Sequence, residues 1–182
     1  MYFKSMPVIS THTFGNGLKV ITIDIENSES ASISAFVGIG SRYEKKEQSG
    51  ISHFIEHILF KGTKSRPNPW DIASSVENVG GVLNASTDQE ITTYWSKVPQ
   101  QNLFTSIDLI FDMFRNSVFE KSGIDKERLV ICEELNMVYD NPESRVEYLI
   151  DQILWADHPL GNEIAGTKDT VMNMTVEEMI KY

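Results

Sequence analysis

The chain has 182 residues, a length that suits one domain with a sizeable hydrophobic core. Hydrophobic residues make up 41% and charged residues 23%, which is ordinary for a soluble globular protein. The net charge of -10 argues against nucleic-acid binding, because that function requires a basic face. The single cysteine, Cys132, excludes an intrachain disulfide, and its apolar neighbours predict a buried side chain.

No apolar run approaches the roughly 20 residues that a membrane-spanning helix needs, so no span is expected. The N-terminus lacks the charged-then-apolar pattern of a signal peptide. Residues 1–6 are expected to be a cloning remnant, with Met6 as a candidate natural start. The default expectation is a cytoplasmic protein, and the alternative is a protein whose targeting peptide has been removed.

The N-terminal part of the sequence is typical of β-structure. Alternating side chains or an adjoining turn mark three strand segments: 11–14, 19–25 and 31–37. The turn signal Gly15-Asn16-Gly17 separates the first two segments, which predicts a hairpin. In the second strand of this hairpin, Ile21, Ile23 and Ile25 would share one face. A polar loop over 38–50 is expected to follow the third strand.

The rest of the sequence mixes helical and strand patterns. Apolar periodicity, capping residues and a proline break predict helices over 51–60, 69–79, 103–114, 124–139, 142–155 and from 175 onward. The last of these opens with the capping box Thr175-Val176-Glu177-Glu178. Residues 82–98 have strand character with a polar middle over 86–89. Strands followed by a mixture of strands and helices indicate an α+β domain.

The most specific motif is His53-Phe54-Ile55-Glu56-His57, which reads H-x-x-E-H. Positions i and i+4 lie on the same face of a helix, so both imidazoles can reach one metal ion. Glu56 is close enough to act as a base at the same point. The alternative is a pair of partly exposed histidines beside an ordinary surface carboxylate.

A zinc site of this kind needs a third protein ligand. The predicted helix over 124–139 offers Glu127, Glu133 and Glu134. Glu127 and Glu134 are separated by about two turns and share a face, whereas Glu133 points roughly 100° away. The apolar run 129–132 is expected to anchor this helix in the core, where carboxylates are costly unless a cation neutralises them. A solvated acidic face is the alternative interpretation.

These motifs together resemble the pitrilysin/insulinase family of zinc metallopeptidases, the inverzincins. The H-x-x-E-H motif and the later pair Glu127 and Glu134 fit the family pattern. A further segment resembles the family's G-G-x-x-N-A-x-T: Gly80-Gly81-Val82-Leu83-Asn84-Ala85-Ser86-Thr87. Additional landmarks are Phe60-Lys61-Gly62-Thr63, His158-Pro159-Leu160-Gly161 and Gly166-Thr167. The resemblance covers nearly the whole chain and is closest in pattern to bacterial processing-peptidase-like members.

The resemblance implies a role for each matching residue. His53, His57 and Glu134 would bind one zinc ion, with Glu133 left as the competing third ligand. Glu56 would be the general base, and Glu127 would orient a ligand histidine from outside the ligand set. Two residues would bind the backbone of an extended peptide substrate at an edge strand: Asn84 and Ala85. Lys61 and Arg145 are further candidate substrate contacts that no spacing argument supports.

The resemblance also implies an architecture and partners. The fold would be an antiparallel or mixed sheet with helices mainly on one face, the repeated domain of a clam-shell protein. Residues 7–182 would form the N-terminal catalytic domain, ending before its last strands and having little activity alone. A second homologous domain or partner chain, in a homodimer or heterodimer, would complete the cleft. The expected function is zinc-dependent endopeptidase, and the alternative is a non-catalytic subunit for assembly or peptide binding.

Overall fold

The computed structural model describes residues 6–156 and 158–182, and the predicted cloning remnant therefore lies mostly outside the described residues. The strands are β1 (Val8–Thr13), β2 (Lys19–Asp24), β3 (Ser30–Val37), β4 (Val82–Thr87) and β5 (Thr92–Pro99). The helices are α1 (Ile51–Leu59), α2 (Pro69–Glu77), α3 (Leu103–Asn116), α4 (Lys121–Asp140), α5 (Pro142–Leu154), α6 (Lys168–Asn173) and α7 (Val176–Lys181). The chain is an α+β protein, as the sequence predicts.

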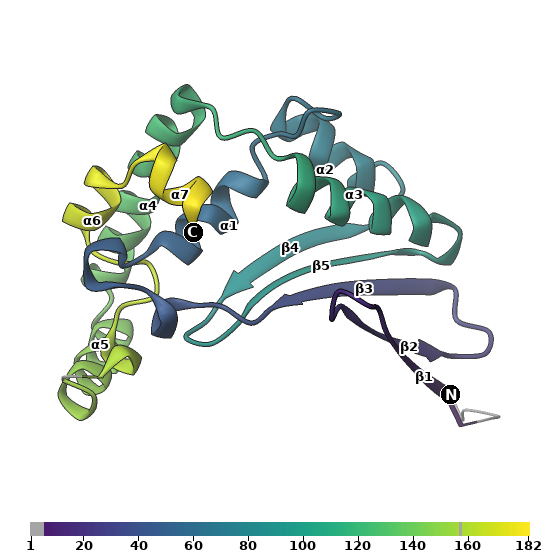
Figure 1. The fold of residues 1–182 in the computed structure, drawn as a ribbon, viewed down its shortest axis with the longest axis horizontal. Coiled ribbons are helices and arrows are strands. Elements are labelled where there is room, and N and C mark those ends of the chain that lie inside the picture. The colour runs from purple at the N-terminus through teal and green to yellow at the C-terminus, as the bar shows by residue number, and fades with distance from the viewer. Residues whose placement is uncertain (1–5, 157) are drawn as a thin grey trace.

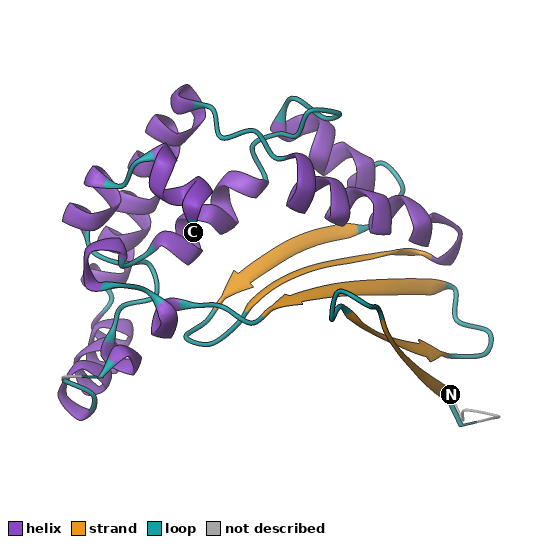
Figure 2. Cartoon of the chain, in the orientation of Figure 1, coloured by secondary structure: helices purple, strands orange, loops and turns teal. Residues whose placement is uncertain are grey.

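Strands β3, β5 and β4 form an antiparallel sheet in that order, with β5 in the centre and β4 at one edge. The hairpin β1–β2 forms a separate two-stranded sheet, which lies on the β3 side of the larger sheet in Figure 1. Helices α2 and α3 cover one face of the three-stranded sheet, and the other helices gather at its end (Figure 2). The face of the sheet that α2 and α3 cover is thus the helical face that was expected, while the remaining described helices lie beyond the end of the sheet.

Two hydrophobic cores hold these layers together. The first lies between the sheet and its covering helices: Leu59, Ile72, Val76, Tyr94, Val98, Leu109 and Met113. The second lies within the helical cluster: Ile51, Phe54, Ile58, Ile124, Ile131, Leu135, Val171, Met174 and Met179. Helix α1 contributes side chains to both cores, and its Ile55 packs against each of them. This shared position explains why apolar residues spread widely around α1, and it locates the H-x-x-E-H motif between the two cores.

Several expectations were wrong in detail. Leu129 and Val130 are 62% and 45% exposed, and only Ile131 of the run 129–132 is fully buried. Four consecutive residues point in four directions around a helix, so one core-facing stripe cannot cover them all. Cys132 is half-buried against the second core and not fully buried.

The hairpin, the strand segment 82–98 and one short helix also differ from the sequence-based prediction. Ile21 and Ile23 of β2, and Ile25 just after it, are exposed because the hairpin forms its own small sheet. The strand segment 82–98 divides at its polar middle into β4 and β5, and the short helix α6 has no counterpart among the predicted elements. Across the described residues, no helix has the length and apolarity needed to cross a membrane.

Candidate metal centre

The N-terminus of α1 is held by a buried carboxylate. Glu44 is 6% exposed and accepts hydrogen bonds from the backbone N–H groups of Gly50 (2.7 Å) and Ser52 (2.9 Å). Gly50 has φ +91°, and a Cβ there would lie 2.5 Å from the Ala165 carbonyl oxygen, so this entry to the helix requires glycine. Burial raises the pKa of Glu44, and the two backbone donors partly offset that effect. The start of the motif helix is therefore defined by tertiary contacts.

Three possible ligand atoms converge at the side of α1. The Nε2 atoms of His53 and His57 are 3.2 Å apart. Glu134 Oε2, on α4, lies 3.9 Å from His53 Nε2 and 3.5 Å from His57 Nε2. Glu133 faces away from this cluster and accepts a hydrogen bond from Asn136 on the same helix. The packing of α1 against α4 thus brings Glu134, and not Glu133, to the two histidines.

The three atoms have the spacing of a zinc ligand set. Ligands about 2.0–2.2 Å from a tetrahedral zinc lie roughly 3.3–3.6 Å from one another, close to the separations seen here. Two imidazoles and one carboxylate also match the ligand chemistry that zinc accepts. Burial, and secondarily the charge of His57, lowers the pKa of His53 to about 4, so this imidazole is neutral and able to donate a lone pair at neutral pH. The residues present therefore fit a divalent metal.

Glu127 contacts the imidazole of His57 at Nδ1, the ring nitrogen that is not directed at His53. The Nδ1 atom of His57 lies 2.8 Å from Glu127 Oε1, and Glu127 is only 4% exposed. The same carboxylate receives the Lys61 ammonium at Oε2, 2.7 Å away. Burial would raise the pKa of Glu127, but the bonds to His57 and Lys61 outweigh it and hold the pKa below its usual range. An anionic Glu127 favours a proton on Nδ1 and leaves Nε2 free for a metal.

Glu56 lies beside the two histidines and contacts the sheet. Its Oε2 accepts a hydrogen bond from the hydroxyl of Thr87, the last residue of β4. Burial raises the pKa of Glu56, and the Thr87 hydrogen bond partly offsets this. A carboxylate with a raised pKa next to a metal-ligand cluster suits proton transfer near neutral pH.

The predicted peptide-binding residues lie on the same strand. Asn84 and Ala85 are in β4, which is the edge strand of its sheet and packs against α1. The Asn84 side chain is exposed, and its Oδ1 accepts a hydrogen bond from the Ala85 N–H (2.8 Å). The structure therefore brings an accessible sheet edge next to the cluster of His53, His57 and Glu134.

Sequence reasoning missed three residues around this centre. It assigned no role to Glu44 or Thr87, and it treated Lys61 as a substrate contact. The sequence does indicate that Lys61 lies near His57, because it follows that histidine by four residues at the end of the predicted motif helix. The contacts of Glu44 and Thr87 depend on loop and strand packing that no spacing rule predicts. Arg145, the other candidate substrate contact, pairs with the buried Glu163 (3.3 Å).

Comparison with known proteins places these features in context. A family model described as insulinase (peptidase family M16) matches residues 19–168. The chain is 34% identical to the zinc protease YmxG of Bacillus subtilis over 175 residues, which is 96% of this chain and 42% of that protein. It is also 34% identical to the mitochondrial-processing peptidase subunit beta of Dictyostelium discoideum, over all of this chain and 38% of that protein.

Solved structures agree with this relationship. The chain superposes on a protease from Helicobacter pylori with a TM-score of 0.91 and 30% identity, covering 97% of this chain and 43% of that one. It superposes on the periplasmic protease PqqL of Escherichia coli with a TM-score of 0.85 and 26% identity, covering 95% of this chain and 20% of that one. The chain thus spans less than half the length of each of these relatives.

Proposed function

Because this chain belongs to the insulinase family, peptidase family M16, we propose that it carries the catalytic zinc centre of a metalloendopeptidase that cuts extended peptides. The observation that carries the proposal is the convergence of His53, His57 and Glu134 within 3.2–3.9 Å of one another, with Glu56 alongside. Glu134 Oε2 approaches both imidazoles at once, and a cation shared by the three side chains would account for this arrangement.

Each residue has a chemical task in this proposal. His53, His57 and Glu134 would hold the zinc ion, whose chemistry when bound would be to polarise the scissile carbonyl and to acidify an attacking water. Glu56 takes the proton from that water and returns it to the leaving amine. Glu127 fixes the ring orientation of His57 and its protonated nitrogen. Thr87 holds the Glu56 carboxylate from the sheet side.

The substrate part of the proposal rests on β4. An extended peptide adds to a free sheet edge through its backbone, and Asn84 and Ala85 lie on such an edge. The Asn84 side chain occupies the Ala85 N–H, so a bound peptide would replace that hydrogen bond with one of its own. This mode selects extended or unfolded segments and would leave folded proteins uncut.

The proposal includes a further domain. Residues 7–182 form the zinc-binding catalytic domain, and a second homologous domain or partner chain completes the substrate cleft. The support is that the chain covers only 42% of the YmxG protease and 38% of a processing-peptidase beta subunit. The subunit name of the latter makes a heterodimer the partner arrangement to examine first, with a homodimer as its competitor.

Zinc content of this chain, and peptide cleavage by the purified full-length protein together with any partner chain, test the proposal. We expect one zinc per chain, lost in Glu134→Gln and retained in the matched control Glu133→Gln. We also expect Glu56→Gln to keep its zinc and to lose turnover by a factor of at least about 10². Unchanged turnover in Glu56→Gln would remove that residue from its role. Stoichiometric zinc without cleavage of any member of a peptide library would instead favour a non-catalytic subunit.

A further inference from the structure

Lys61 forms an ion pair with Glu127, the carboxylate that contacts His57 from outside the candidate ligand set. Its Nζ lies 2.7 Å from Glu127 Oε2, while the other oxygen of the same carboxylate lies 2.8 Å from His57 Nδ1. Glu127 is 4% exposed, so it has little access to water and depends on these two partners. A line of contacts therefore runs from the Lys61 ammonium through Glu127 to the imidazole of His57.

The formal charges around the centre balance only when Lys61 is counted. Glu56, Glu127 and Glu134 contribute three negative charges, and Lys61 contributes one positive charge. The resulting net charge of about -2, with neutral histidines, matches one divalent cation. Without the ammonium, a loaded centre would retain a buried uncompensated negative charge.

The turn after α1 holds Lys61 in place. Lys61 donates its backbone N–H to the Ile58 carbonyl (2.9 Å), and Gly62 follows with φ +149°, where a Cβ would lie 2.6 Å from the Pro67 carbonyl oxygen. Thr63 then donates its hydroxyl to Asp112 on α3 (2.6 Å).

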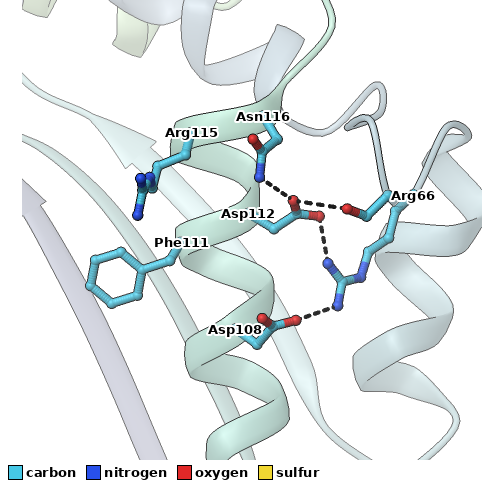
Figure 3. Close-up of a pocket in the computed structure, with 7 residues that line it drawn as sticks. Arg66, Asp108, Phe111, Asp112, Arg115 and Asn116 are labelled. Carbon is cyan, nitrogen blue, oxygen red and sulfur yellow. Dashed lines mark hydrogen bonds and ion pairs between the residues drawn. The ribbon is translucent and has the colours of Figure 1, made fainter.

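Asp112 also pairs with Arg66, just after this turn, as Figure 3 shows. Its carboxylate is 7% exposed and also accepts hydrogen bonds from Asn116 (2.8 Å) and from the Arg66 guanidinium. Arg66 reaches Asp108 with its other nitrogen (2.7 Å). These pairings fix the segment that presents Lys61.

We propose that Lys61 is a positioning residue that holds Glu127 against His57 and thereby raises the affinity of the centre for zinc. The inference rests on the proposed function, because it concerns the same zinc site. It replaces the expectation that Lys61 contacts substrate, since its ammonium already pairs with a buried carboxylate on the side of His57 opposite Nε2.

Zinc affinity, measured in the purified protein by competition with a chromophoric chelator, tests this role. We expect Lys61→Met to weaken zinc binding roughly 10- to 100-fold, the usual effect of losing an outer-sphere partner. Lys61→Arg should recover much of the affinity. The matched control is Lys64→Met, which removes the same charge from an exposed position three residues away and should change affinity less than about twofold. If Lys61→Met does not fold, Lys61→Gln takes its place.

Two further measurements separate positioning from a general loss of charge. In a Glu127→Gln background, adding Lys61→Met should weaken zinc binding no further, because the lysine acts through that carboxylate. Nitrogen NMR of the metal-free protein should show His57 protonated at Nδ1 in the wild type and a mixed tautomer in Lys61→Met. Unchanged zinc affinity and an unchanged His57 tautomer in Lys61→Met would overturn the role of Lys61. So would a loss of zinc affinity from Lys61→Met that is as large in the Glu127→Gln background as in the wild type. Either result would leave the proposed function standing. A wild-type protein that binds no zinc would overturn the proposed function as well.

Discussion

At the scale of single residues, the centre consists of pairs in which one side chain orients another. Glu127 orients His57, Lys61 orients Glu127, and Thr87 orients Glu56. His53 differs, because its Nδ1 is buried without a hydrogen-bond partner among the described residues. Its orientation therefore depends on the packing of α1, and its low pKa of about 4 follows from burial.

The hydroxyl of Thr87 should matter for turnover and not for metal binding. Thr87→Val preserves the shape of the side chain but removes the hydrogen bond to Glu56. A hydrogen bond to a charged group contributes about 1.5–3 kcal/mol, so we expect kcat to fall roughly 10- to 100-fold in cleavage assays while zinc content stays the same. Thr87→Ser retains the hydroxyl and should keep most of the activity. Equal kcat in Thr87→Val and wild type would contradict the role of this bond.

At the scale of elements, the location of α1 explains the arrangement of the site. The helix lies between two cores, is capped by Glu44 at its start and continues into a turn that Asp112 anchors. These contacts fix both ends of the segment that carries His53 and His57. Helix α4 is held in the second core by Ile124, Ile131 and Leu135, which keeps Glu127 and Glu134 facing α1. The ligand geometry is therefore set by packing on both sides.

The anchoring role of Asp112 predicts a large effect on stability. Asp112→Asn would leave Arg66, which is 19% exposed, without its buried counter-ion, and we expect a loss of about 3–5 kcal/mol in the free energy of unfolding. Asp108→Asn is the matched control, because Asp108 pairs with the same guanidinium but is 72% exposed. That change should cost less than about 1 kcal/mol. Urea titrations of the two variants test the difference, and similar losses would contradict it.

The same carboxylate predicts a dependence of stability on pH. Burial would raise the pKa of Asp112, but hydrogen bonds from Thr63, Asn116 and Arg66 outweigh it and hold the pKa below the ordinary value of 3.8. A lowered pKa in the folded state contributes stability above pH 3.8, and this contribution is lost as pH falls through the folded-state pKa. The stability difference between wild type and Asp112→Asn should therefore shrink below about pH 4 in urea titrations at a series of pH values.

At the scale of the whole molecule, the candidate centre links two parts of the fold. His53 and His57 come from α1, which packs on the sheet and on the helical cluster, and Glu134 comes from α4 within that cluster. A metal that joins them binds only when these helices are packed, so it should stabilise the folded state.

Zinc should therefore raise the melting temperature of the protein. At a free zinc concentration about 1,000 times Kd, linkage adds about 4 kcal/mol, which corresponds to a rise of roughly 8–16 °C for a chain of this size. Calorimetry with and without zinc measures this shift, and a chelator should reverse it. Magnesium is the control, because it prefers octahedral oxygen ligands and should have little effect. An unchanged melting temperature at saturating zinc would contradict a zinc site between α1 and α4.

The sequence by itself determined the family and the α+β class, and it predicted the ligand chemistry of the candidate centre, because these depend on local spacings. Two histidines four residues apart must share a helix face, and Glu127 and Glu134 must share another. Only the tertiary structure decided that Glu134 lies nearer the histidines than Glu133, that Lys61 contacts Glu127, and that Thr87 contacts Glu56. It also showed that Leu129 and Val130 are exposed. These outcomes depend on how α1, α4 and β4 pack against one another, and such long-range contacts are not encoded in the spacing of any one segment.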